Sequence, residues 1–281
     1  MTPWNLELGL STGCFYRRRI FDVLEEIRES GFESIEVCSF PQHLNYHRSE
    51  DVTRAGERLR ALGLRPVSFH APFSDAIDIT ALDLTERAAG VRELLTACEA
   101  AAAMGVEKVV LHPGPERRGR REDAEFLDKM RNAAESLNTV AKRCARLGVH
   151  LVLENMLPHL LFGHISDMLY LLGSIEERDV GACLDTGHAF LAGELDTVIH
   201  KLSGHLHLVH VNDNHGDRDA HLPPGKGGIY WPRVLADLKQ CQFSGTLILE
   251  LSSQEGESVA NTLERARQAR LYLEELMAEM H

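Results

Sequence analysis

The stretch from Leu206 to Gly228, LHLVHVNDNHGDRDAHLPPGKGG, contains a predicted strand followed by a polar loop with candidate functional residues. It begins as a strand that is largely apolar on both faces, which is typical of a strand covered on two sides. His210 is the last inward residue of that strand, and the chain then becomes a loop rich in Gly, Pro, Asn and Asp. Asp219 and His221 lie two residues apart in this loop, so an extended backbone projects both side chains to the same side. We therefore expect this pair to reach one ion or one substrate.

Short apolar runs alternate with longer runs of helical period along the rest of the chain. No composition break, linker or low-complexity tract interrupts them, and a single α/β barrel takes about 250 residues. The sequence therefore predicts one domain over residues 1–281, a single (β/α)8 TIM barrel of the α/β class. The eight expected strands are Leu8–Ser11, Ser34–Cys38, Pro66–His70, Val106–His112, His150–Asn155, Val180–Asp185, the strand that begins at Leu206, and Thr246–Leu251.

A histidine or a carboxylate lies at the end of each strand from the third to the eighth. The active site of a closed barrel lies at the carboxyl ends of its strands, so these side chains should meet at one mouth. Four such groups in a low-dielectric mouth would repel one another or stay unsatisfied without a cation. The six residues are His70, His112, Glu154, Asp185, His210 and Glu250, and we expect Glu154, Asp185, His210 and Glu250 to bind a metal.

Further donors lie close to these strand ends. His188 follows Asp185 at i+3 in CLDTGH, where Gly187 lets the chain turn. With Asp219 and His221, the oxygen and imidazole donors suit Zn, Mn, Co or Fe, and no thiolate is among them. Five residues are therefore expected to bind either additional metal or the substrate: His70, His112, His188, Asp219 and His221.

The charge and composition of the chain limit the kinds of molecule that it is expected to bind. A net charge of -12 argues against a large surface that neutralises nucleic-acid phosphates, so we consider nucleic acid an improbable partner. The run 116–121, ERRGRR, is the one dense basic cluster and is interpreted as a solvated loop, with contact to a phosphate or polyanion as the alternative. Arg17 to Arg19 form a second basic stretch. The six cysteines are scattered without a CxxC pair, which predicts reduced thiols.

Membrane association is not expected either. No apolar run approaches the roughly 18 residues of a membrane span, and the N-terminal stretch MTPWNLELGL lacks a signal-peptide layout. The sequence therefore predicts a cytoplasmic protein without a membrane partner, and leaves homo-oligomerisation open.

Seven short strings give the chain a family resemblance: SFHAPF, VVLHPG, LVLEN, CLDTGHAF, HVND, DAHLPPGKGGI and LILEL. Together they resemble the xylose isomerase-like TIM barrels, which include sugar phosphate isomerase and epimerase relatives and the type IV apurinic endonucleases. In the epimerases, the resemblance implies one divalent ion, often manganese, bound at Glu154, Asp185, His210 and Glu250, with both glutamates acting as acid and base. In the endonucleases it implies three zinc ions, and all nine ligand positions have matches here.

We interpret the chain as a divalent-metal-dependent sugar or sugar phosphate isomerase or epimerase that transfers a proton next to a carbonyl. Mn or Zn is the favoured metal, with Co, Fe and Mg as alternatives. Glu154 and Glu250 would exchange the proton, while His188, Arg218 and Glu36 would contact substrate hydroxyls. Two alternatives remain: a zinc-dependent type IV apurinic/apyrimidinic endonuclease, and a barrel that binds a polyol without turnover.

Overall fold

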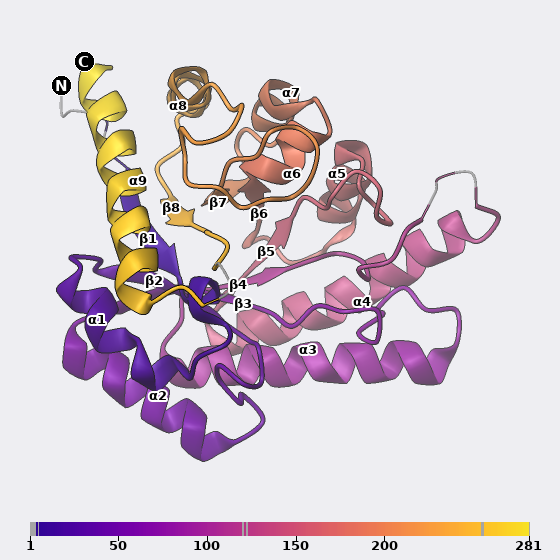
Figure 1. The fold of residues 1–281 in the computed structure, drawn as a ribbon. Helices are drawn as coiled ribbons and strands as arrows, with labels where there is room; N and C mark the ends of the chain where they lie inside the picture. The colour runs from indigo at the N-terminus through magenta and orange to yellow at the C-terminus, as the bar shows by residue number, and fades with distance from the viewer. Residues whose placement is uncertain (1–3, 5, 120, 122, 254–255, 281) are drawn as a thin grey trace.

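Eight parallel strands close into a barrel in which neighbours in sequence are neighbours in space. The computed structural model describes residues 4, 6–119, 121, 123–253 and 256–280, and Figure 1 shows its strands surrounded by helices. The predicted (β/α)8 TIM barrel is confirmed. The strands are β1 (Glu7–Ser11), β2 (Ser34–Cys38), β3 (Arg65–His70), β4 (Lys108–Leu111), β5 (His150–Glu154), β6 (Val180–Asp185), β7 (Leu206–Val211) and β8 (Thr246–Leu249).

Helices follow the strands around the outside of the barrel (Figure 1). Left-handed glycines end the helices α2, α3 and α4 at Gly63, Gly105 and Gly148, where φ is 65°, 82° and 74°. The helices are α1 (Leu24–Glu29), α2 (Ser49–Leu62), α3 (Leu84–Met104), α4 (Phe126–Leu147), α5 (Ile165–Ser174), α6 (Thr186–Leu191), α7 (Leu195–Lys201), α8 (Trp231–Gln240) and α9 (Val259–Glu279), with 3-10 turns at Thr12–Phe15 and Ile20–Asp22.

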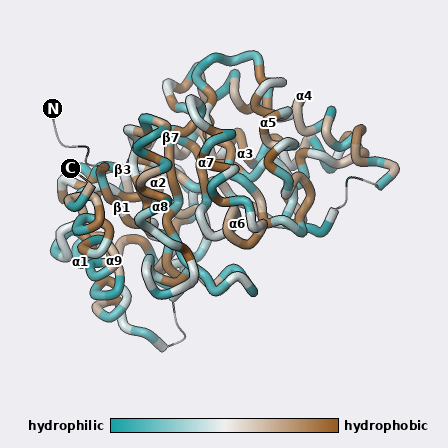
Figure 2. Tube along the Cα trace, turned by 90° about the horizontal axis from the view of Figure 1, so that it is seen from above, coloured by the Kyte–Doolittle hydropathy of each residue, from teal (hydrophilic) through white to brown (hydrophobic). Residues whose placement is uncertain are grey.

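The larger hydrophobic core lies between the strands and these helices. Figure 2 shows brown and teal alternating along the helical turns, as expected for helices with one buried face. Trp231, Phe32 and Phe69 are among the largest fully buried side chains of this layer. Among the described residues, no helix is both long and apolar enough to cross a membrane. All six cysteines are free in the structure, and five of them are buried.

A second, smaller core fills the barrel interior and determines where the site lies. It consists of Val67, Val110, Val152, Cys183, Leu208 and Ile248, all with 0% exposure. Because side chains alternate along a strand, the residue two positions after an interior residue also points inward. Five of these six residues are followed at that spacing by His112, Glu154, Asp185, His210 and Glu250. The inner core therefore forms a dry floor beneath a layer of histidine and carboxylate side chains.

Candidate metal centre

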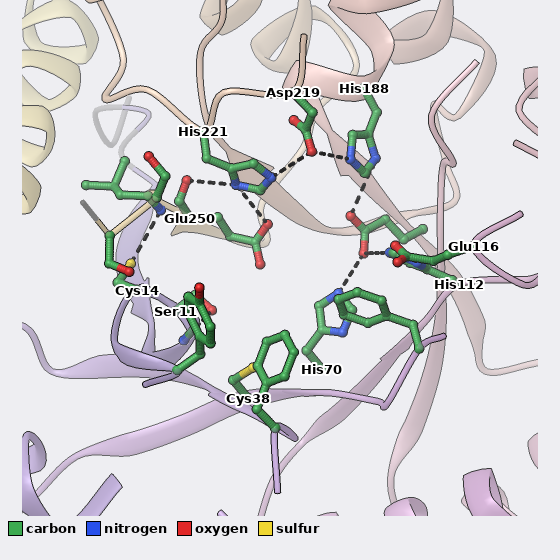
Figure 3. A pocket seen from close by; sticks show the side chains of 18 of the residues that line it. Ser11, Cys14, Cys38, His70, His112, Glu116, His188, Asp219, His221 and Glu250 are labelled. Atoms are coloured by element: carbon green, nitrogen blue, oxygen red, sulfur yellow. Dashed lines mark hydrogen bonds and ion pairs between the residues drawn. The ribbon is translucent and has the colours of Figure 1, made fainter. Parts of the chain in front are cut away.

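The mouth of the barrel gathers its histidines and carboxylates into three adjoining groups. Figure 3 shows six of these residues around the cavity: His70, His112, His188, Asp219, His221 and Glu250. The first is His70, His112 and Glu154. The second is Glu154, Asp185, His210 and Glu250, and its ligand atoms all lie within 4.8 Å of one another. The third is His188, Asp219 and His221, connected by contacts between their side chains. All nine donors found in the sequence are therefore in one place.

Glu154 is shared by the first two groups. Its Oε2 atom lies 3.2 Å from His70 Nε2 and 3.3 Å from His112 Nε2. Its Oε1 atom lies 3.2 Å from His210 Nδ1, which in turn lies 3.4 Å from Glu250 Oε2. Glu154 therefore contacts three of the histidines, His70, His112 and His210, and would be held in common by any cations bound at the first two groups.

The third group comes from two loops. His188 follows β6 on the short helix α6, and Asp219 and His221 come from the long loop after β7. Asp219 Oδ2 lies 3.5 Å from His188 Nε2 and 3.1 Å from His221 Nε2. The expectation that Asp219 and His221 project to one side therefore agrees with the contacts in the structure.

Outer contacts fix four of the five imidazole rings. One nitrogen of each ring faces a backbone carbonyl or the carboxylate of Glu36, and the other faces a carboxylate of the three groups, as in metal sites where an outer partner orients the ligand. These contacts join His70 Nδ1 to Ala71 O at 3.0 Å, His188 Nδ1 to Asn155 O at 2.8 Å, His210 Nε2 to Glu36 Oε2 at 3.0 Å and His221 Nδ1 to Glu250 O at 3.2 Å.

Asp185 is held by two hydrogen bonds that orient its carboxylate. Oδ1 accepts from the backbone N–H of His188 at 2.7 Å, which caps helix α6, and Oδ2 accepts from Asn212 Nδ2 at 2.7 Å. A Cβ atom on Gly187 would lie 2.0 Å from Asn212 Oδ1. A glycine at 187 is therefore required for the close approach of Asn212, whereas its backbone is helical and does not have the positive φ that only glycine adopts readily.

The loop that carries Asp219 and His221 is closed around Asp213. This fully buried carboxylate accepts from the backbone N–H groups of Gly225 and Ile229 and from Trp231 Nε1, each at 3.0 Å. His221 itself has a φ of 43°, a conformation that non-glycine residues rarely adopt. The hydrogen bonds of the loop thus hold a strained histidine in the third group.

The carboxylates favour positive charge in the site. Burial opposes protonation of His70, but Glu154 and other carboxylates outweigh it and raise the pKa of His70 to about 9. Burial also opposes protonation of His188, but Asp185 and Asp219 outweigh it and raise the pKa of His188 to about 10. In the same way, Asp219 outweighs the effect of burial and raises the pKa of His221 to about 9. Without a metal, these rings hold protons at neutral pH.

Buried polar atoms that lack a hydrogen-bond partner support metal binding at these groups. Glu154 Oε2, His210 Nδ1 and Asp219 Oδ1 are buried and lack a hydrogen-bond partner of suitable geometry among the described residues. A buried polar atom without a partner costs free energy, which coordination to a cation would remove. The donors are imidazole nitrogens and carboxylate oxygens, as zinc and manganese sites use. The residues present therefore fit a divalent metal.

Glu36 and Arg218 do not lie in the cavity at the barrel mouth. Glu36 points inward from β2 and is fully buried, where it accepts hydrogen bonds from Ser11 Oγ at 3.1 Å and Ser68 Oγ at 2.8 Å and contacts His210. Burial raises the pKa of Glu36, but His210 more than offsets this and lowers it to about 2. Arg218 is exposed. The structure gives neither residue a direct contact with the space that a substrate would fill.

The cavity has a volume of about 320 Å³ and two unlike walls. The metal-binding side chains form one wall. In Figure 3, Ser11, Cys14 and Cys38 lie on the opposite side. Three aromatic residues also line the cavity: Tyr16, Phe40 and Phe73. Sequence reasoning did not find them because they lie in loops, where no periodicity marks them.

The basic cluster 116–121 is largely occupied by internal ion pairs. Arg117 pairs with the buried carboxylate of Asp78, and Arg121 Nη2 lies 3.0 Å from Asp167 Oδ1, which is also buried. Arg120 lies outside the described residues. No Lys or Arg lines the cavity within the described part of the chain. These ion pairs support a structural role for two of the arginines.

A family model for the xylose isomerase-like TIM barrel matches residues 24–276. The chain belongs to this family. A probable endonuclease 4 of Nitratidesulfovibrio vulgaris is 31% identical over 246 residues, which cover 78% of this chain and 83% of that protein.

Solved structures with the same barrel include sugar epimerases. A D-tagatose 3-epimerase-like protein superposes with a TM-score of 0.80 at 24% identity, covering 96% of this chain and 99% of that chain. The IOLI protein with a bound zinc atom superposes with a TM-score of 0.82 at 16% identity, covering 98% of this chain and 99% of that chain. At these identities, the similarity establishes the fold of this family member and leaves its substrate to be argued from the site.

Proposed function

We propose that the protein is a divalent-metal-dependent isomerase or epimerase of a sugar or sugar phosphate, which transfers a proton at a carbon next to a carbonyl. The observation that carries this proposal is the placement of Glu154 and Glu250. Both carboxylates line the cavity, and both approach His210 Nδ1, at 3.2 and 3.4 Å. Two carboxylates that flank one metal position can also flank one substrate carbon. The epimerases among the structural neighbours agree with this choice.

The ion would be held by Glu154, Asp185, His210 and Glu250, with Mn or Zn as the metals that best suit the donors. It supplies positive charge for the negative charge that develops on the substrate oxygens. One glutamate removes the proton from one face of the carbon and the other returns a proton from the opposite face. His188 lines the cavity together with His221, and we assign it the contact with a substrate hydroxyl.

Endonuclease chemistry is the second candidate, and one observation favours it. The nine donors form three adjoining groups, as three zinc ions would require, and a probable endonuclease 4 is among the relatives. A DNA enzyme also needs contacts to phosphates. The described lining of the cavity supplies no Lys or Arg, and Arg117 and Arg121 pair with buried carboxylates. Arg17 to Arg19, which are exposed beside Tyr16, are the remaining basic stretch near the mouth.

Metal analysis combined with two assays distinguishes the candidates. Protein purified without added metal is analysed for its elements, then tested for epimerisation of a ketose panel and for nicking of duplex DNA with an abasic site at physiological salt. We expect about one ion per chain, epimerisation and no useful nicking. Three zinc ions per chain with efficient metal-dependent nicking would establish the endonuclease instead. Binding of a polyol without either reaction would support the non-catalytic alternative.

A further inference from the structure

A second cavity adjoins the metal-binding one. It has a volume of about 490 Å³ and lies between the loops after β2 and β3 and the first half of helix α3. Phe40 and Phe73 line both cavities. Their ring centroids are 6.0 Å apart in an edge-to-face arrangement, so these two rings mark the boundary. A molecule bound at the metal could therefore extend past them into the second cavity.

The second cavity is mainly apolar. Pro41, Pro72, Ile77 and Ala89 contribute to its lining together with the two phenylalanines. Its one carboxylate, Glu93, accepts a hydrogen bond from Tyr46 Oη and lies 2.9 Å from His47 Nε2. No Lys or Arg lines it among the described residues. An anionic group would meet a carboxylate and no permanent cation, whereas an apolar group would remove hydrocarbon surface from water.

We infer that the substrate is a sugar that carries an uncharged apolar substituent, an alkyl or aryl group, and that this substituent occupies the second cavity while the carbonyl end binds at the metal. The inference rests on the proposed function and specifies its substrate class. A row of rings connects the two ends: Phe73 lies 4.8 Å from the ring of His112 and 5.0 Å from that of His70. A flat or apolar group can pack along this row.

Three ligands that differ at one position test the inference. D-fructose, its 6-O-benzyl ether and its 6-phosphate keep the same carbonyl end, and calorimetry on the metal-loaded protein measures their affinities. We expect the benzyl ether to bind at least about tenfold more tightly than fructose, equivalent to about 1.4 kcal/mol. The phosphate should gain nothing from its added group in the second cavity. Equal affinity for fructose and its benzyl ether, or tightest binding of the phosphate, would overturn the inference.

Variants on helix α3 test whether the tighter binding of the benzyl ether arises in the second cavity. Ala89 is exposed and lines the second cavity, so Ala89→Trp should fill it and remove the benzyl preference while leaving fructose binding unchanged. Ala88→Trp, at the adjacent exposed residue outside the lining, is the matched control and should retain the preference. Ala76→Trp tests the same cavity from the loop after β3. A benzyl preference that survives both Ala89→Trp and Ala76→Trp would contradict this location.

The outcomes separate this inference from the proposed function. A benzyl preference that disappears in Ala89→Trp, in a protein that turns over no ketose, would support the second cavity and count against the epimerase. Ketose turnover without a benzyl preference would do the reverse. If no member of the series binds to the metal-loaded protein, both are wrong.

Discussion

The two sides of the barrel mouth have opposite chemistry. Strands β4 to β8 and the segments after them supply eight of the nine candidate metal ligands, whereas the loops after β1, β2 and β3 supply Tyr16, Phe40 and Phe73. The change occurs within one short segment, because His70 ends β3 and Phe73 follows three residues later. The polar side suits the reacting end of a substrate, and the aromatic side suits the part that distinguishes one substrate from another.

Loss of a carboxylate on the polar side should have the largest effect. Asp185→Asn keeps an oxygen to accept from the N–H of His188, so helix α6 should remain, but it removes the negative charge that holds the cation. We expect metal content at background and no turnover, a loss greater than the 10- to 100-fold typical of an outer partner. Asp217→Asn, an exposed change in the next loop, is the control. Unchanged metal content in Asp185→Asn would refute the ligand assignment.

Removal of one basic carboxylate should impair chemistry more than binding. Glu250→Gln retains a carbonyl oxygen but cannot accept the proton, so kcat should fall by about 10² to 10⁴ with a smaller change in KM. Steady-state kinetics at matched metal occupancy measures this, and Glu154→Gln should behave similarly. Glu116→Gln is the control, because Glu116 lines the same cavity outside the three metal groups. Equal losses in Glu250→Gln and Glu116→Gln would argue against a proton-transfer role.

Substitution of Glu36, which contacts His210 on the side away from the cavity, should have an intermediate effect on metal affinity. Glu36 accepts from His210 Nε2 and leaves Nδ1 facing the metal-binding carboxylates. Glu36→Gln should weaken metal affinity by about 10- to 100-fold, as is typical of outer partners of metal-bound histidines. Titration of the metal-free protein with Mn or Zn measures the affinity. Glu33→Gln, at an exposed position just before β2, should leave it unchanged, and an unchanged affinity in Glu36→Gln would remove the proposed role of Glu36.

The smallest expected effect is a change in the Tm of the metal-free protein with pH. It tests the excess of negative charge on the polar side of the barrel mouth. Folding raises the pKa of His70, His188 and His221 from 6.5 to between about 9 and about 10. The stability gained from their protonation is fully present below pH 6.5 and is lost as pH rises through the folded pKa values. The Tm of the metal-free protein should therefore fall between pH 7 and pH 10.

A metal ion held by Glu154, Asp185, His210 and Glu250 would place positive charge beside these three rings and disfavour their protonation, so its stabilising effect should grow as pH rises over the same range. Differential scanning calorimetry of metal-free and metal-loaded protein measures the gap in Tm. A gap that stays constant from pH 7 to pH 10 would show that the three histidines do not hold these protons in the metal-free state.

The polar side was largely predictable from the sequence, and the aromatic side was not. Strands β2 and β6 have the predicted bounds, because short apolar runs mark them. Barrel closure then places the strand-end residues together without further information. Helices α5, α6 and α7 were not delimited, since short helices leave weak periodic patterns.

Partnerships across the barrel also escaped prediction. Glu36 was expected to contact a substrate hydroxyl, but closure of the barrel brings it to His210, which is 174 residues away in sequence. The ion pairs of Arg117 and Arg121 with Asp78 and Asp167 depend on loop conformations that the sequence does not specify. Tyr16, Phe40 and Phe73 were missed for the same reason.

The central claim is that metal-bound Glu154 and Glu250 exchange a proton at a substrate carbon. Its most direct test is nuclear magnetic resonance of a ketose panel in deuterated water with the metal-loaded protein and with Glu250→Gln at matched metal occupancy. We predict an epimer that carries solvent deuterium at the inverted carbon, formed about 10² to 10⁴ times more slowly by the variant. Full-rate epimerisation by Glu250→Gln would contradict the two-carboxylate account.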